Sequence, residues 1–114
     1  MAEEIDQLGK NQSRELASLI AVVMVHLLKL EASPVSGPRA RWRETIREQR
    51  DEIERLLVDA PSLRARVPSI VTVEIGRARM RAQEALADHD EQPHIDLDTI
   101  SYDRDQVLGD WFPA

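Results

Sequence analysis

Arginine is the residue type in this chain best suited to bind a charged ligand. The planar guanidinium presents a fork of N–H donors that matches phosphate and carboxylate groups. Ten arginines fall into two groups along the middle of the sequence: Arg39, Arg41, Arg43, Arg47 and Arg50, then Arg64, Arg66, Arg77, Arg79 and Arg81. We predict a candidate interaction surface drawn from both groups: Arg39, Arg41, Arg43, Arg47, Arg50, Arg77, Arg79 and Arg81.

Nucleic acid is the alternative ligand, because a basic stripe can hold a phosphate backbone. Bases also need aromatic side chains to stack on, and Trp42 is the sole aromatic residue between positions 39 and 81. The spacing of Trp42 assigns it to the core, and intervening acidic residues neutralise much of the arginine charge. A protein partner is therefore the expected ligand.

His26 is the candidate metal ligand or proton carrier of the first predicted helix, within the apolar run from Leu19 to Leu28. Metal ligands occur in sets. No His, Asp or Glu stands three or four residues from His26. We interpret His26 as a structural, hydrogen-bonded residue.

An acidic segment later in the chain carries side chains that bind divalent cations: Asp88, His89, Asp90, Glu91, His94, Asp96 and Asp98. Their spacing matches no helical or loop ligand pattern. We therefore expect a solvated loop, with no metal and no cofactor.

Catalytic motifs are also missing from the sequence. It has no glycine-rich phosphate loop, no Gly-x-Ser-x-Gly segment and no paired His-Glu metal motif. Ser62 suits a helix start and Tyr102 suits packing. We predict that the protein is not an enzyme.

The composition fits one domain in a reducing compartment. The chain has 114 residues and no cysteine, which excludes disulfides and thiolate sites and favours the cytoplasm. Its longest apolar run is too short to span a bilayer, so we expect no membrane partner. The net charge of -6 is uneven, with 11 arginines against 7 acids in residues 39–81 and 9 acids against Arg104 alone in residues 82–114. This asymmetry marks either a binding face or, more commonly, solvated helices followed by a polar end that folds back on the arginines.

Apolar residues at intervals of three and four predict the first helix over residues 2–31. Its second half is apolar nearly all round, so this helix should be central. Gly9 weakens it, and a kink or break at 9–13 is expected.

Two further helices follow. Pro34, Gly37 and Pro38 define a linker at 33–38, so the helix predicted for residues 39–59 must run antiparallel to the first. A third helix, kinked by Pro68, is predicted for residues 62–87, as a short helical turn at 62–66 followed by a long helix from about Pro68 to Ala87.

The C-terminal part is expected to be an acidic loop at 88–100 and a short helix at 102–108 with Ser101 as its N-cap. Trp111 and Phe112 should then fold back onto the bundle. The fold class predicted is all-α, an antiparallel bundle of three main helices plus a short C-terminal helix. His26, Trp42 and Trp111 are assigned structural roles.

Several motifs, spread over nearly the whole chain, form a specific combination: Ala2 to Ile5, Leu8 to Lys10, Arg14 to Leu16, Met24 to Lys29, Trp42 to Arg50, Pro61 to Arg64, Ala78-Arg79, and a tail with Tyr102, Gln106, Val107, Leu108, Phe112 and Pro113. With them the chain resembles the domain of unknown function 29 (DUF29) family, small helical proteins of cyanobacteria and other bacteria. The resemblance implies a helical bundle and assigns no activity.

Members of that family usually begin with a further amphipathic stretch before the segment matching Glu3-Glu4-Ile5. Two explanations stay open: a shortened member whose first helix has an uncovered apolar stripe, or a start that lies further upstream. An uncovered stripe would be closed by self-association, which predicts a homodimer.

These observations lead to a functional hypothesis. We expect a non-enzymatic helical interaction module that binds itself or a protein partner. The alternative is a small nucleic-acid-associated regulator that uses the arginine-rich helix faces.

Overall fold

The computed structural model describes residues 2–113, and the side chains of residues 10–113. Three long helices make up most of it: α1 (Ala2–Ala32), α2 (Arg39–Asp59) and α3 (Val67–Asp88). Shorter elements are the 3-10 turns η1 (Pro61–Arg66) and η2 (Leu97–Thr99) and the helix α4 (Arg104–Leu108). No strand occurs between residues 2 and 113, so the predicted all-α class is confirmed.

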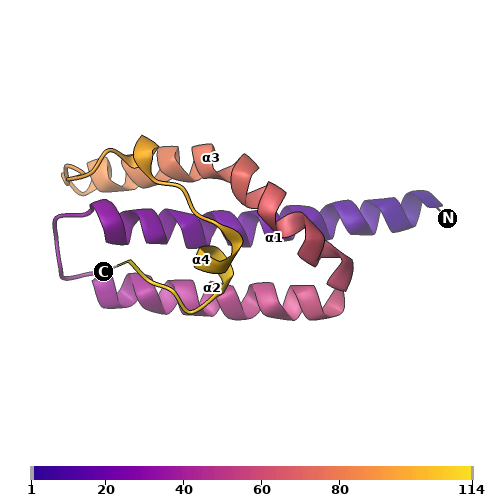
Figure 1. Cartoon of the computed structure of the whole chain (residues 1–114). Helices are drawn as coiled ribbons and strands as arrows, with labels where there is room; N and C mark the ends of the chain where they lie inside the picture. The colour runs from indigo at the N-terminus through magenta and orange to yellow at the C-terminus, as the bar shows by residue number, and fades with distance from the viewer. Residues whose placement is uncertain (1, 114) are drawn as a thin grey trace.

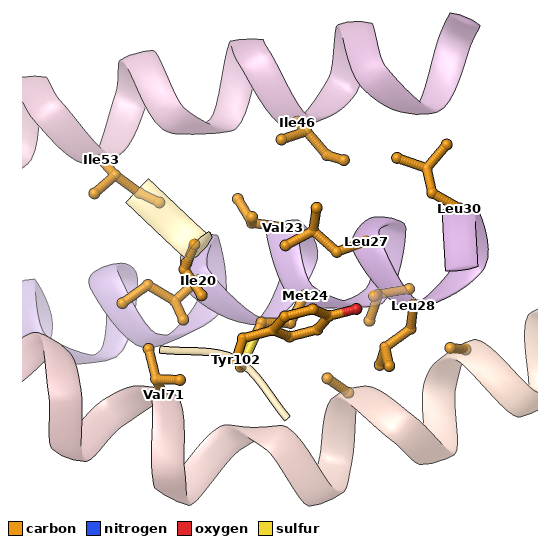
Figure 2. Packing of buried hydrophobic residues seen from close by; sticks show 14 of the residues in the cluster. Ile20, Val23, Met24, Leu27, Leu28, Leu30, Ile46, Ile53, Val71 and Tyr102 are labelled. Atoms are coloured by element: carbon orange, nitrogen blue, oxygen red, sulfur yellow. The ribbon is translucent and has the colours of Figure 1, made fainter. Parts of the chain in front are cut away.

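Helix α1 is the centre of the bundle. It packs along both α2 and α3, and Figure 1 shows it lying between them. Figure 2 shows Val23 and Leu27 of α1 facing Ile46 of α2, while Ile20 lies next to Val71 of α3. Because it has a neighbour on each side, α1 is buried on more of its circumference than the ordinary single stripe.

Prolines set the boundaries of the long helices. The linker between α1 and α2 contains Pro34 and Pro38, and the carbonyl of Pro38 accepts a hydrogen bond from the Trp42 N–H at 3.0 Å. Pro68 lies in the first turn of α3, where its missing N–H costs nothing. The short turn and long helix predicted for residues 62–87 are confirmed, as the 3-10 turn η1 followed by the regular helix α3.

The predicted break in the first helix is wrong. α1 is continuous from Ala2 to Ala32, so it runs through residues 9–13. Adding residues to an existing helix is much more favourable than starting one, and the well-packed second half of α1 supplies that start. Local glycine propensity is too weak to interrupt it.

The C-terminal segment crosses one side of the bundle, between α2 and α3 (Figure 1). Leu97, Tyr102 and Val107 are buried in the core, and Trp111 and Phe112 are partly buried against it. Figure 2 shows Tyr102 lying over Met24 of α1. This segment is therefore an integral part of the core.

The N-cap of α4 is Asp103, so the prediction of Ser101 was wrong. The Asp103 carboxylate accepts from the Gln106 N–H at 2.8 Å, and the Gln106 side chain accepts from the Asp103 N–H at 3.0 Å. These reciprocal bonds form a capping box, which satisfies two helix-end donors at once. Gly109 follows the helix because a Cβ there would lie 2.6 Å from the Asp105 carbonyl oxygen.

Candidate interaction surfaces

Arg50 of α2 holds the C-terminal segment by its backbone. Its Nε donates to the Val107 carbonyl at 2.9 Å, and its Nη2 donates to the carbonyls of Gln106 at 2.8 Å and Trp111 at 2.7 Å. Its guanidinium carbon also lies 4.9 Å from the centre of the Phe112 ring, within cation–π range. Burial lowers the pKa of Arg50, and the nearby charge of Asp110 opposes that shift.

Two other predicted surface arginines have similar structural roles. Arg79 of α3 donates to the Ile100 carbonyl from Nε at 3.1 Å and from Nη2 at 2.6 Å. Arg39 donates from Nη1 to the Leu30 carbonyl at 2.6 Å, near the C-terminus of α1, where carbonyls have no intrahelical partner. We call Arg39, Arg50 and Arg79 the clamp arginines. The C-terminal segment thus folds back onto arginines through its carbonyl groups rather than its carboxylates.

The other predicted surface arginines of α2 differ in their surroundings. Arg47 stacks against Phe112, with its guanidinium carbon 5.1 Å from the ring centre. Arg41 is exposed and Arg43 is half-buried. Neither makes an ion pair or side-chain hydrogen bond with another described residue, so both stay available to a ligand.

Arg77 and Arg81 line a groove between α1 and α3, of about 490 Å³. Arg14 of α1 lines the same groove, and we call these three the groove arginines. The other residues that line the groove are Ala17, Ser18, Ala21, Val22 and Glu74. The predicted surface omitted Arg14, because nothing local in the sequence shows which turn of α1 faces which turn of α3. The eight predicted arginines therefore fall in several places rather than on one face.

His26 and Trp42 are part of the packed structure. The Nδ1 of His26 lies 2.8 Å from the Val22 carbonyl, to which it can donate. Burial lowers the pKa of His26, and the charges of Lys29 and Arg81 lower it further, against the Val22 bond. Trp42 is buried, with the Lys29 ammonium 5.0 Å from its ring centre.

The acidic segment that follows α3 is hydrogen-bonded to residues at the C-terminal end of α1. The Ser33 hydroxyl donates to the Glu91 carboxylate, and the backbone N–H of His94 donates to the Ala32 carbonyl at 2.9 Å. The His94 ring bonds the Glu31 carbonyl at 2.7 Å through Nε2. Within the described part of the chain, no three His, Cys, Asp or Glu side chains gather in a way that could hold a metal ion.

The apolar stripe of α1 is covered by the chain itself from Leu16 onward, where Leu16, Ile20 and Leu27 are all 0% exposed. The earlier part of that predicted stripe, with Ile5 and Leu8, lies outside the described side chains. No helix of residues 2–113 has the length and apolar character needed to cross a membrane.

Two exposed apolar side chains lie on α3, in addition to Val58 of α2. Val73 and Met80 are 76% and 63% exposed. They share one side of the helix with three other exposed residues, and together these form what we call the outer face of α3: Ser69, Val73, Gly76, Met80 and Glu84. This face points away from α1, because α3 buries the opposite residues Val71, Ala78 and Ala82.

Comparison with known proteins gives one match. A family model described as "Domain of unknown function DUF29" matches residues 1–112. No curated protein and no solved structure matches the chain.

Proposed function

The chain belongs to the DUF29 family, and we propose that it acts as a non-enzymatic interaction module that pairs with a second copy of itself through the outer face of α3. We place this activity in the cytoplasm, which the lack of cysteine supports.

Gly76 is the observation that carries this proposal. It is exposed in the middle of α3, where glycine costs about 1 kcal/mol relative to alanine. A Cβ built on Gly76 would meet nothing within 4 Å, so packing inside the chain does not require glycine here. The close approach of another backbone does require it.

The residues around Gly76 favour a second copy as the partner. Val73 and Met80 lie one turn to either side of it, so an antiparallel pair with its two-fold axis near Gly76 places Val73 of one copy against Met80 of the other. Such a contact is isologous and closes on itself.

The strength of this pairing is modest. Burying a valine or methionine side chain contributes about 1.5–3 kcal/mol, and four such side chains are buried across the axis. Association itself costs roughly 4–15 kcal/mol. The expected dimer is therefore weak and reversible, so that changes in protein concentration control how much of it forms.

The alternative, a small nucleic-acid-associated regulator, has fewer arginines at its disposal. Arg39, Arg50 and Arg79 are already bonded within the chain, and Arg47 stacks against Phe112, which leaves Arg41, Arg43 and the groove arginines. Phosphate contacts from these positions would lack an exposed aromatic neighbour for base stacking.

Analytical ultracentrifugation from micromolar to millimolar concentration tests the proposal. The unaltered chain should shift from monomer to dimer, and Met80→Glu should stay monomeric. Gly76→Leu should do the same while raising the melting temperature of the monomer, since leucine favours the helix. Val58→Glu is the matched control, because Val58 of α2 is also 64% exposed but lies on another helix.

Two results would reject the proposal. One is an unaltered chain that sediments as a monomer at the highest concentration. The other is a Val58→Glu variant that loses the dimer as completely as Met80→Glu.

A further inference from the structure

The groove between α1 and α3 concentrates positive charge in a protein whose net charge is -6. Arg14, Arg77 and Arg81 line it, against Glu74 as the one acidic lining residue. We propose that this groove binds a small phosphate-bearing molecule, held by the three groove arginines. The proposal goes beyond self-association, and it uses a different side of α3.

The charges in the groove are poorly compensated. Arg77 and Arg81 lie four residues apart on α3, where like charges destabilise a helix by roughly 0.2–0.5 kcal/mol. Arg14 and Arg81 make no ion pair or side-chain hydrogen bond with any other residue that the structure describes. Arg77 has one long contact, from Nη1 to the Glu74 carboxylate at 3.7 Å. An anion between the helices would relieve this repulsion.

Phosphate fits this charge better than a carboxylate does. Three guanidinium groups and one carboxylate leave a net charge of about +2, which a phosphate group of about -1.5 to -2 charge balances. Its oxygens accept paired bonds from arginine forks. The Ser18 hydroxyl, one turn from Arg14 on α1, is a further donor at the rim of the groove.

The size of the groove suits a small molecule. Its volume of about 490 Å³ lies within the range of roughly 300–1,000 Å³ seen for small-molecule sites. On the α1 side, the small side chains of Ala17 and Ala21 leave room in the groove for a ligand. No aromatic residue lines it, so recognition rests on the phosphate group rather than on stacking of a base.

The test uses the full chain and two probes, inorganic phosphate and pyrophosphate, with a single-stranded oligonucleotide for comparison. Binding is followed by calorimetric titration, with parallel mapping of backbone amide shifts by NMR. We expect saturable binding, with shifts centred on residues 14–22 and 74–81. The double variant Arg14→Gln with Arg81→Gln should weaken binding at least tenfold. Arg41→Gln with Arg43→Gln removes the same charge from α2 and should change affinity less than twofold.

Glu74→Gln gives an independent check in the opposite direction. Removing the one carboxylate of the groove should tighten phosphate binding several-fold, a gain that unfolding cannot imitate. Gly76→Leu, which blocks self-association without adding a charge, should leave phosphate binding unchanged, so failure of self-association and failure of this site can be told apart.

Several outcomes would overturn the proposal. They are the absence of saturable binding, an equal loss in the Arg41 and Arg43 control, or weaker binding in Glu74→Gln. Tighter binding of an oligonucleotide than of pyrophosphate, lost in the Arg41 and Arg43 control, would also overturn it and would support the nucleic-acid alternative.

Discussion

The clamp arginines and the groove arginines differ in the acceptor groups that surround them. Arg50 and Arg79 meet the backbone carbonyls of the C-terminal segment, and Arg39 meets a carbonyl at the end of α1. Arg14, Arg77 and Arg81 instead share one groove with a single carboxylate. Arginine therefore stabilises the fold in one region, and in the other it stays available to bind a ligand.

The difference comes from the supply of unsatisfied carbonyls. The last carbonyls of a helix have no hydrogen-bond partner within the helix, and few carbonyls of a connecting segment have a partner within that segment. A guanidinium with five N–H donors can satisfy several of them together, as Arg50 does for Gln106, Val107 and Trp111. Helices α1 and α3 pair their carbonyls internally along the groove, so no such acceptors are available there.

The largest effect that tests this comparison is expected for Arg50→Ala. Losing three charge-assisted bonds to carbonyls should reduce the free energy of unfolding by about 2–4 kcal/mol, as measured by urea denaturation. Arg50→Lys keeps the charge but lacks the planar fork, so it should recover less than half of that loss. A change under about 0.5 kcal/mol in Arg50→Ala, the level typical of surface substitutions, would show that Arg50 does not clamp the segment.

Tyr102 sharpens the comparison, since it holds the same segment with a neutral donor. Its hydroxyl donates to the Glu31 carboxylate, and Tyr102→Phe should cost roughly 1 kcal/mol. Burial raises the pKa of Tyr102, and the bond to Glu31 raises it further. Tyr102 therefore keeps its proton to a higher pH in the folded state than in the unfolded state. Its contribution to the free energy of unfolding is fully present below pH 10.0, the usual tyrosine pKa, and falls as pH rises above it.

The chain contains one tyrosine, so tyrosinate absorbance reports Tyr102 alone. Ionisation should coincide with alkaline unfolding seen by circular dichroism, and Tyr102→Phe should lose part of the alkaline destabilisation. Ionisation near pH 10 in a chain that stays folded would contradict the buried, bonded hydroxyl.

The smallest effect is expected in the groove. Without ligand, Arg14→Gln with Arg81→Gln should change the free energy of unfolding by less than about 0.5 kcal/mol, and in the stabilising direction because like-charge repulsion is removed. Urea denaturation under the conditions used for Arg50→Ala gives the direct comparison. A loss as large as that of Arg50→Ala would erase the distinction between the two sets.

Sequence periodicity was enough to predict the all-α class and a bundle, because buried stripes at helical spacing are local features. The Asp103 cap also had a local signal, with Gln106 three residues later, which the preference for Ser101 overlooked. The roles of the arginines had no such signal. Arg50 and Arg43 both lie among acidic residues on one helix, and only the C-terminal segment, more than fifty residues further along, separates a clamp from an available side chain.

The placement of the C-terminal segment also bears on the order in which the molecule folds. Helices α1 and α2 meet across a six-residue linker, whereas Tyr102 reaches Glu31 across 71 residues and Arg50 reaches Trp111 across 61. Contacts between distant residues must overcome a larger loop-closure entropy, so they form slowly. The C-terminal segment, which makes these contacts, crosses one side of the bundle (Figure 1). We therefore expect the C-terminal segment to dock after α1 and α2 have paired, and to detach as one unit in local unfolding.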